Sequence, residues 1–149
     1  MTLQTVRRLG AIAILGVGAV HLQQYLAGYH SIPTIGPLFL LNAVSSVVVA
    51  IGLLAPIERI LRPRGTELTS GLLAGAALAI AAGSLVALFV SENGTLFGFS
   101  ETGYRTVIVL AIIAEALAVV LLAPVAAVSL KRAASGGTAP GMTRAVTTP

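Results

Sequence analysis

The hydrophobic pattern of the chain consists of four long apolar segments separated by short polar ones. The apolar segments cover about residues 9–29, 35–54, 68–90 and 104–122. A helix that rises about 1.5 Å per residue crosses the ~30 Å hydrocarbon layer of a bilayer in about 20 residues. The pattern therefore predicts an all-α fold, a polytopic membrane bundle of four helices.

Proline and glycine mark the connections between these segments. Pro33 and Pro37 favour a tight turn, because proline restricts the residue before it and fits the first turn of a helix. Residues 55–67 form the polar connection before the third segment, and Asn93 with Gly94 signals a turn before the fourth.

Pro124 should end or kink the fourth helix, with a continuation to Leu130 as the alternative. Residues 133–149 are rich in Gly, Ala, Thr and Pro without any periodicity, and we predict a disordered cytoplasmic tail there. The four spans then make up one domain, residues 1–132.

The composition supports a membrane protein. Hydrophobic residues make up 56% of the 149 residues and charged residues only 9%, whereas soluble domains are about 25% charged. Cysteine is absent, which excludes disulfides and thiolate metal sites. The net charge of +4 does not indicate nucleic acid, because the basic residues lie at the ends of apolar segments and form no stripe with aromatics. The expected environment is the lipid bilayer.

The distribution of basic residues predicts the orientation. Lys and Arg residues fall into three groups: Arg7, Arg8; Arg59, Arg62, Arg64; Lys131, Arg132, Arg144. The two connections that alternate with these groups contain one Arg or Lys residue, Arg105. By the positive-inside rule both termini are cytoplasmic, in a multi-pass protein of the cell membrane. The first segment is expected to stay as a helix and not to be cleaved as a signal peptide, because no convincing small-residue cleavage site follows it.

Polar side chains inside the predicted spans should meet at one depth. At 1.5 Å per residue, His21, Asn42 and Glu115 lie about 12, 10 and 16 Å from the outer ends of their helices. Gln24, Ser45 and Ser46 border the same level. We predict that these six residues form a ligand-binding cluster in the outer half of the bundle, without catalytic residues or a metal site.

Two of these side chains allow more than one interpretation. An ionised Glu115 at mid-span costs about 2.5–3.5 kcal/mol, so it either carries a proton or binds a ligand, or it is a protonated acid that holds helices together. His21 is a hydrogen-bond partner of Glu115, a haem or metal ligand, or a satisfied core histidine. Asn42 and its serine neighbours are typical of helix–helix contacts in membranes.

The third segment carries small residues at every fourth position, namely Gly71, Gly75, Ala79 and Gly83. Such a pattern lets two helix backbones approach closely in lipid. It offers a face for a membrane protein partner or a homo-oligomer.

The segments GVGAVHL, from Gly16, and IGPLFLLNAVSSVVVAIGLLAPIER, from Ile35, resemble small four-helix membrane proteins of the DoxX-like kind. The Leu96–Phe99 segment LFGF and the intramembrane Glu115 are similar to actinobacterial membrane proteins. The resemblance implies a setting beside quinone-linked oxidoreductases. It also implies a carboxylate in the second helix, where this chain has Asn42.

Three functions follow from these features. The first is a non-enzymatic accessory or structural membrane subunit, in which the polar cluster stabilises the bundle. The second is a binding site for a lipophilic redox ligand, quinone or haem, at the His/Asn/Glu cluster. The third is a proton-coupled permeation path through Glu115. No nucleotide-binding or nucleophile motif indicates an enzyme.

Overall fold

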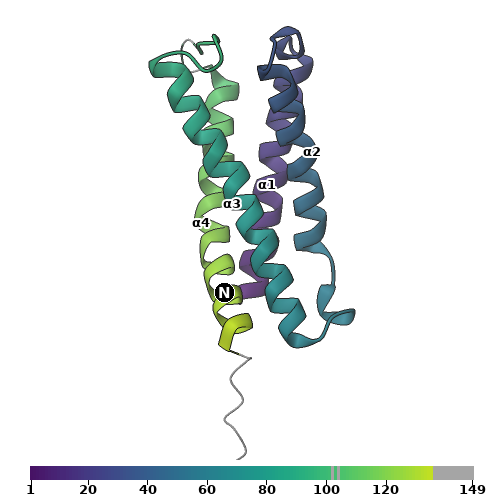
Figure 1. The fold of residues 1–149 in the computed structure, drawn as a ribbon. Coiled ribbons are helices and arrows are strands. Elements are labelled where there is room, and N and C mark those ends of the chain that lie inside the picture. The colour runs from purple at the N-terminus through teal and green to yellow at the C-terminus, as the bar shows by residue number, and fades with distance from the viewer. Residues whose placement is uncertain (102, 104, 136–149) are drawn as a thin grey trace, which may run out of the picture.

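The structure, a computed structural model, describes residues 1–101, 103 and 105–135. Within them lie four helices that are long and apolar enough to cross a membrane. The predicted all-helical fold with four spans is thus confirmed. The elements in chain order are α1 (Leu3–Leu26), the 3₁₀ turn η1 (Tyr29–Ser31), α2 (Ile35–Leu54), the 3₁₀ turn η2 (Ile57–Arg59), α3 (Pro63–Asn93) and α4 (Thr106–Ser135) (Figure 1).

Helix α2 has the predicted bounds, whereas α1 is displaced toward the N-terminus. It begins at Leu3 because the Thr2 side chain accepts a hydrogen bond from the backbone N–H of Thr5 and caps the helix. It ends at Leu26, and Gly28 then takes a φ of +131°, a conformation that glycine adopts without strain. Tyr29, expected at the end of the first span, therefore belongs to η1.

Helices α3 and α4 are longer than predicted. Pro63 occupies the first turn of α3, where its missing N–H costs nothing, so the helix begins before residue 68 and the preceding connection is short. Helix α4 continues through Pro124 to Ser135, so it follows the alternative of a continuation to Leu130 and does not end at residue 122. Residues 133–135 are helical and not part of a tail. Neighbouring helices make an internal proline tolerable in membrane helices. Tyr104 and residues 136–149, with the rest of the predicted tail, lie outside the described residues.

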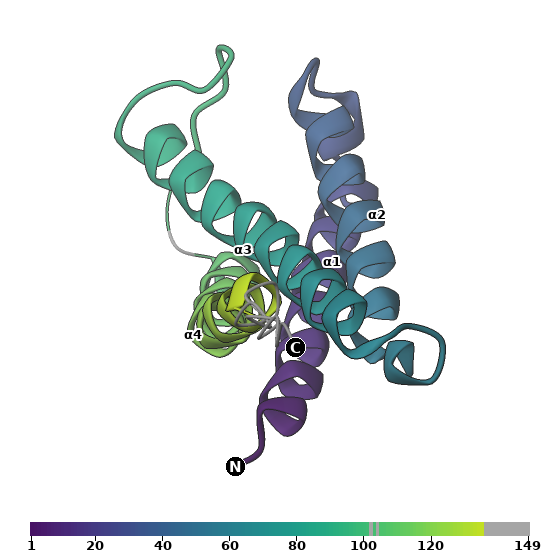
Figure 2. The same cartoon turned by 60° about the horizontal axis from the view of Figure 1, so that its bottom comes forward.

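The helices form two hairpins that share one core. Helix α1 packs along α2 and α4, and α4 packs along α3, whereas α2 and α3 contact each other less. The start of α1, the α2–α3 connection and the end of α4 lie at one end, called here the basal end (Figure 1). The α1–α2 turn and the α3–α4 loop lie at the opposite, distal end, toward which α2 and α3 diverge (Figure 2).

The core is built from small and branched apolar side chains. Ala11, Ile14 and Val17 of α1 are completely buried, as are Ala74 of α3 and Leu122 of α4. Many large apolar side chains point outward instead: Ile12, Leu41, Val48, Leu72 and Val120 are each at least 60% exposed. Apolar side chains over so much of the outer surface are what a lipid environment requires.

The small residues of α3 lie partly against α4 and partly on the outer surface. Gly71 is buried under Leu130 of α4, and a Cβ atom added at Gly71 would lie 2.7 Å from the Leu130 Cδ2 atom. Ala79 and Gly83 are exposed, and a Cβ added at Gly75 or Gly83 would meet no described atom within 4 Å. One end of the pattern thus mediates α3–α4 packing, and the remainder faces outward.

Candidate functional site

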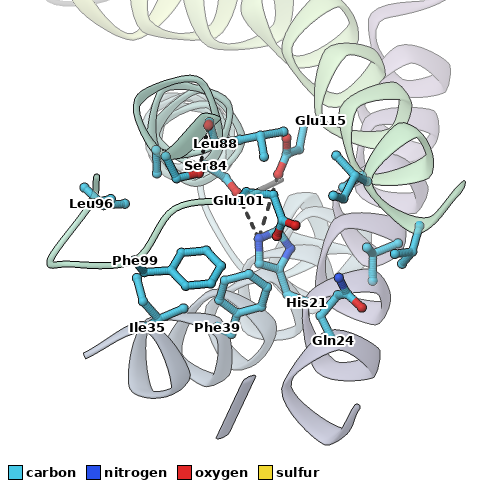
Figure 3. A pocket seen from close by; sticks show the side chains of 16 residues that line it. His21, Gln24, Ile35, Phe39, Ser84, Leu88, Leu96, Phe99, Glu101 and Glu115 are labelled. Atoms are coloured by element: carbon cyan, nitrogen blue, oxygen red, sulfur yellow. Dashed lines mark hydrogen bonds and ion pairs between the residues drawn. The ribbon is translucent and has the colours of Figure 1, made fainter. Parts of the chain in front are cut away.

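A cavity of about 90 Å³ lies at the distal half of the bundle, where the two hairpins separate. All four helices and the α3–α4 loop contribute to its wall. Its polar lining comprises His21, Gln24, Ser84, Ser91, Glu101 and Glu115 (Figure 3). Its apolar lining comprises Val20, Ile35, Phe39, Ala87, Leu88, Leu96, Phe99, Val107, Ile108 and Ala111.

Three helices bring a histidine, a serine and a glutamate together in this cavity. The Nε2 atom of His21 on α1 lies 2.9 Å from the Oγ atom of Ser84 on α3 and 3.9 Å from the Oε1 atom of Glu115 on α4 (Figure 3). His21 is 7% exposed and Glu115 only 1%. The imidazole therefore meets both the serine hydroxyl and the carboxyl group inside the bundle.

The backbone of α1 determines the tautomer of His21. Its Nδ1 atom lies 2.9 Å from the carbonyl oxygen of Val17. A carbonyl oxygen only accepts hydrogen bonds, so Nδ1 carries a proton and donates it. In a neutral imidazole Nε2 is then an acceptor, which receives the hydrogen of the Ser84 hydroxyl. The Oε1 atom of Glu115 lies 3.9 Å from the same Nε2 atom, beyond the distance of a hydrogen bond.

One oxygen of Glu115 has no partner in this arrangement. Its Oε2 atom is buried and makes no hydrogen bond to any residue that the structure describes. Buried polar atoms are nearly always paired, since leaving one unpaired costs about 1–3 kcal/mol. The residue that carries this unpaired oxygen lines the cavity.

Aromatic rings form one side of the cavity. The ring of Phe39 lies with its centroid 5.0 Å from that of His21 and 4.8 Å from that of Tyr29. Phe99, from the α3–α4 loop, meets Tyr29 edge to face at 5.6 Å. Such tilted and edge contacts are the favoured geometries of aromatic pairs. They give the cavity a flat apolar face beside its polar one (Figure 3).

A polar cluster joins the two hairpins at the distal end. The Tyr29 hydroxyl donates a hydrogen bond to Oε2 of Glu101, and Arg105 donates to the Tyr29 oxygen at 2.5 Å and to Oε1 of Glu101 at 3.1 Å. Burial, and then the hydrogen bond and charge of Glu101, raise the pKa of Tyr29 to about 12. Because Glu101 also lines the cavity, this cluster fastens the α1–α2 turn to the loop that covers the site.

The predicted site residues divide into two groups. His21, Gln24 and Glu115 line the cavity together. Asn42 and Ser45 do not line this cavity and lie instead in a neighbouring groove between α2 and α3. Ser46 is fully buried, donates a hydrogen bond of 3.2 Å to Asn42 and lies against Gly18, so it belongs to the α1–α2 contact.

The groove opens on the outer surface between α2 and α3 and has a volume of about 360 Å³. Its outward rim includes the exposed residues Leu38, Leu41 and Gly83. Its inner wall is shared with the cavity through His21, Ile35, Phe39, Ser84, Ala87 and Leu96. The groove thus brings the outside of the bundle next to the cavity that contains His21 and Ser84.

Sequence reasoning missed Ser84, Phe39, Phe99 and Glu101 as site residues. Ser84 carried a usable signal, since it is the polar residue of the stretch from Gly71 to Val90 and lies at the same depth as the others. The aromatic and loop residues carried none, because their positions depend on how the α3–α4 loop folds back. Leu96 and Phe99 pair there through backbone hydrogen bonds of 2.7 and 2.9 Å.

Comparisons of the chain with protein-family models, with curated proteins and with solved structures give no match.

Proposed function

We propose that this multi-pass membrane protein binds a lipophilic ligand with a hydrogen-bonding headgroup, of the quinone class. The headgroup occupies the distal cavity beside His21, Ser84 and Glu115. The apolar tail lies in the α2–α3 groove and continues into the lipid. Ligand sites of this kind are mostly apolar, with a few convergent polar groups that orient the ligand.

The unpaired Oε2 atom of Glu115 carries this proposal. If the polar cluster only held the helices together, its buried atoms would be paired with one another, because a partly satisfied network is worse than an apolar core. The cavity that Glu115 lines gives a partner from outside the chain room to bind. We therefore favour a ligand site over a purely structural cluster.

The chemistry of the lining suits a quinone in both redox states. A quinone carbonyl accepts hydrogen bonds from a protonated Glu115 or from the Gln24 amide, and a hydroquinone hydroxyl donates to the carboxylate. Phe39 and Phe99 provide the apolar face on which a flat ring packs. His21, whose Nε2 atom lies 3.9 Å from the Oε1 atom of Glu115, accepts or returns the proton that Glu115 exchanges with the ligand.

The same features argue against haem. The Nε2 atom of His21, which would coordinate iron, is engaged by Ser84 at 2.9 Å. The other histidine, His30, lies in η1 with its Nδ1 atom 3.0 Å from the Tyr25 carbonyl oxygen. A cavity of about 90 Å³ holds one ring with its substituents and not a porphyrin.

The packing below the cavity argues against a permeation path through one chain. Toward the basal end Glu115 is followed by Ala118 and Leu122 of α4, which face Ile14 and Val17 of α1 in the apolar core. A proton on Glu115 therefore meets an apolar barrier toward the basal end.

The setting follows from charge and from the DoxX-like resemblance. The basal end carries Arg7, Arg8, Arg59, Arg62, Arg64, Lys131 and Arg132, so we propose that it is the cytoplasmic end in the cell membrane. An accessory subunit that holds a quinone near a membrane oxidoreductase fits both the resemblance and the site.

The test is the ligand that the protein retains when it is extracted from its membrane with a nanodisc-forming polymer. Organic extraction and mass spectrometry should recover about one quinone per wild-type chain and a clear deficit for Glu115→Leu. Glu67→Gln, which removes a carboxylate at the basal end, is the matched control and should retain the ligand. Wild-type protein with no more quinone than empty nanodiscs of the same membrane would contradict the proposal.

A further inference from the structure

A second polar pocket lies at the basal end, far from the cavity in the fold. It has a volume of about 250 Å³ and is lined by parts of α1, η2, α3 and α4. Its charged and polar lining residues are Gln4, Arg7, Glu58, Glu67, Ser129 and Arg132. Leu3 and Val125 add an apolar edge. The proposed quinone site uses none of these residues.

Arg7 is the central residue of this pocket. It is 7% exposed, although charged residues are rarely buried. Its Nη1 group donates to the Ser70 hydroxyl at 3.2 Å, and its Nη2 atom lies 3.6 Å from the Oε2 atom of Glu58. Its Nε group is buried and has no hydrogen-bond partner among the described residues. A guanidinium has five N–H donors, so Arg7 has donors left for a ligand.

The ion pairs around the pocket are loose. The Arg7–Glu58 separation is 3.6 Å and the Arg132–Glu67 separation is 3.5 Å, whereas a tight charge-assisted hydrogen bond measures about 2.7–2.9 Å. Glu58 also accepts a hydrogen bond of 3.2 Å from Gln4. Its own backbone N–H, and then the charges of Arg7 and Arg59, hold the pKa of Glu58 below its usual range. The pocket therefore presents two cations and two anions with unused bonding capacity.

This charge pattern selects among ligands. A phosphate alone would meet Arg7 and Arg132 but also two carboxylates, which repel it. An ammonium group alone would be attracted by the two carboxylates but repelled by Arg7 and Arg132. A ligand that carries both charges satisfies both pairs, because arginine binds phosphate oxygens in a fork and a primary ammonium donates three hydrogen bonds to carboxylates.

We propose that the basal pocket binds a phosphoethanolamine group, with its phosphate on Arg7 and Arg132 and its ammonium on Glu58 and Glu67. A phospholipid is the source that the position favours, because the pocket lies at the ends of the spans, where lipid headgroups are found, and has an apolar edge. Basic pockets between membrane helices bind lipid headgroups in this way.

The test is native mass spectrometry of the delipidated full chain, to which phosphatidylethanolamine, phosphatidylcholine and phosphatidylglycerol with identical acyl chains are added. Phosphatidylethanolamine should bind at least about tenfold more tightly than the other two, since each of them lacks the charged hydrogen bonds that the primary ammonium donates to the two carboxylates. Phosphatidylcholine separates the effect of the positive charge from that of the hydrogen bonds, because its quaternary ammonium has no N–H to donate. Soluble phosphoethanolamine and inorganic phosphate, added in separate arms, show whether the glycerol and acyl chains contribute.

Variants assign the site. Arg7→Gln should weaken the binding of all three lipids at least about tenfold, because each of them carries the phosphate. Arg64→Gln, which removes the same charge from an exposed position, should leave binding unchanged. Glu58→Gln should equalise phosphatidylethanolamine and phosphatidylcholine while retaining both. If Arg7→Gln fails to fold, Arg7→Lys keeps the charge and should still weaken binding about tenfold. Equal affinities of the wild type for the three lipids, or lipid binding that Arg7→Gln leaves unchanged, would overturn the proposal.

Discussion

The Oγ atom of Ser84 on α3 lies 2.9 Å from the Nε2 atom of His21 on α1, and the same Nε2 atom lies 3.9 Å from the Oε1 atom of Glu115 on α4. Helices α1 and α3 contact each other little elsewhere, so the Ser84–His21 hydrogen bond is their main polar link at the distal end. It fixes the imidazole through both nitrogens, since Nδ1 donates to the Val17 carbonyl. The site is therefore shaped before a ligand binds.

Ser84→Ala should leave the Nε2 atom of His21 buried without its partner. We expect the free energy of unfolding to fall by about 1–3 kcal/mol, the usual cost of an unpaired buried polar group. Ser45→Ala is the control, because Ser45 lies in the groove and is half-buried, and its effect should stay within about 0.5 kcal/mol. Denaturation in detergent followed by circular dichroism measures both. Equal effects would show that the Ser84 contact is not formed.

Glu115→Leu separates a ligand site from a structural cluster. Leucine fills a similar volume and removes the unpaired Oε2 atom, so we expect the free energy of unfolding of the unliganded protein to stay level or rise. If the carboxyl group held the helices together, the same change would cost about 3–5 kcal/mol, as for a broken buried pair. Thermal unfolding of delipidated protein distinguishes the two outcomes. Glu115→Gln, which keeps polarity and shape, shows whether any loss comes from the charge or from packing.

Tyr29 should make the distal end sensitive to high pH. Its pKa is raised from an ordinary value near 10 to about 12 by burial and by Glu101, so the phenol stabilises the fold fully below about pH 10, and this stabilisation is lost as the pH rises through 12. The difference in ultraviolet absorbance between wild type and Tyr29→Phe should titrate with a midpoint near 12. A midpoint near 10 would mean that Tyr29 is neither buried nor in contact with Glu101.

Two glycines should respond to alanine in opposite directions. A Cβ atom at Gly36 would lie 2.8 Å from the backbone oxygen of Tyr29 and 2.9 Å from the Cα atom of His30, and these backbone atoms cannot rotate away. We expect Gly36→Ala to lower the free energy of unfolding by about 1–3 kcal/mol. Gly83→Ala meets open space and should raise it by about 0.5–1 kcal/mol, since glycine weakens a helix. The same pair tests the outward α3 face: a change in oligomeric state with Gly83→Ala alone would reveal a partner helix there.

The orientation can be tested with introduced cysteines, because the chain has none of its own. Arg64→Cys lies at the basal end and Phe97→Cys in the exposed distal loop. In intact cells a membrane-impermeant maleimide should label position 97 directly and position 64 only after permeabilisation. The reverse pattern would place the basic end outside.

Hydropathy predicts the number of helices well and their ends poorly. The apolar runs specify the spans because the bilayer requires about 20 apolar residues in a row. The apolar runs do not show how far a helix continues beyond the lipid. Helix α1 begins at Leu3 because Thr2 caps it and because Glu58, far along the chain, pairs with Arg7. Helix α4 passes Pro124 and continues to Ser135, where Ser129 and Ala133 are buried against its neighbours.

Depth arithmetic brings His21 and Glu115 to one level because helices are nearly straight rods with a fixed rise. It does not give the rotation of each helix about its own axis. Asn42 lies at the predicted depth but lines the groove between α2 and α3. Ser46, one turn further along α2, packs against Gly18 of α1. Packing decides this rotation. Gly18 of α1 leaves the space that Ser46 occupies, and that pairing is not visible from either helix alone.

The affinity of the purified protein for a short-chain quinone, measured by isothermal titration in quinone-free nanodiscs, tests the central proposal most directly. We predict one site per chain, with affinity weakened at least about tenfold by Ser84→Ala and by Glu115→Leu and unchanged by Glu67→Gln, as expected for lost hydrogen bonds at the headgroup. Binding that is absent in the wild type, or equally strong in all four proteins, would contradict a quinone site between His21 and Glu115.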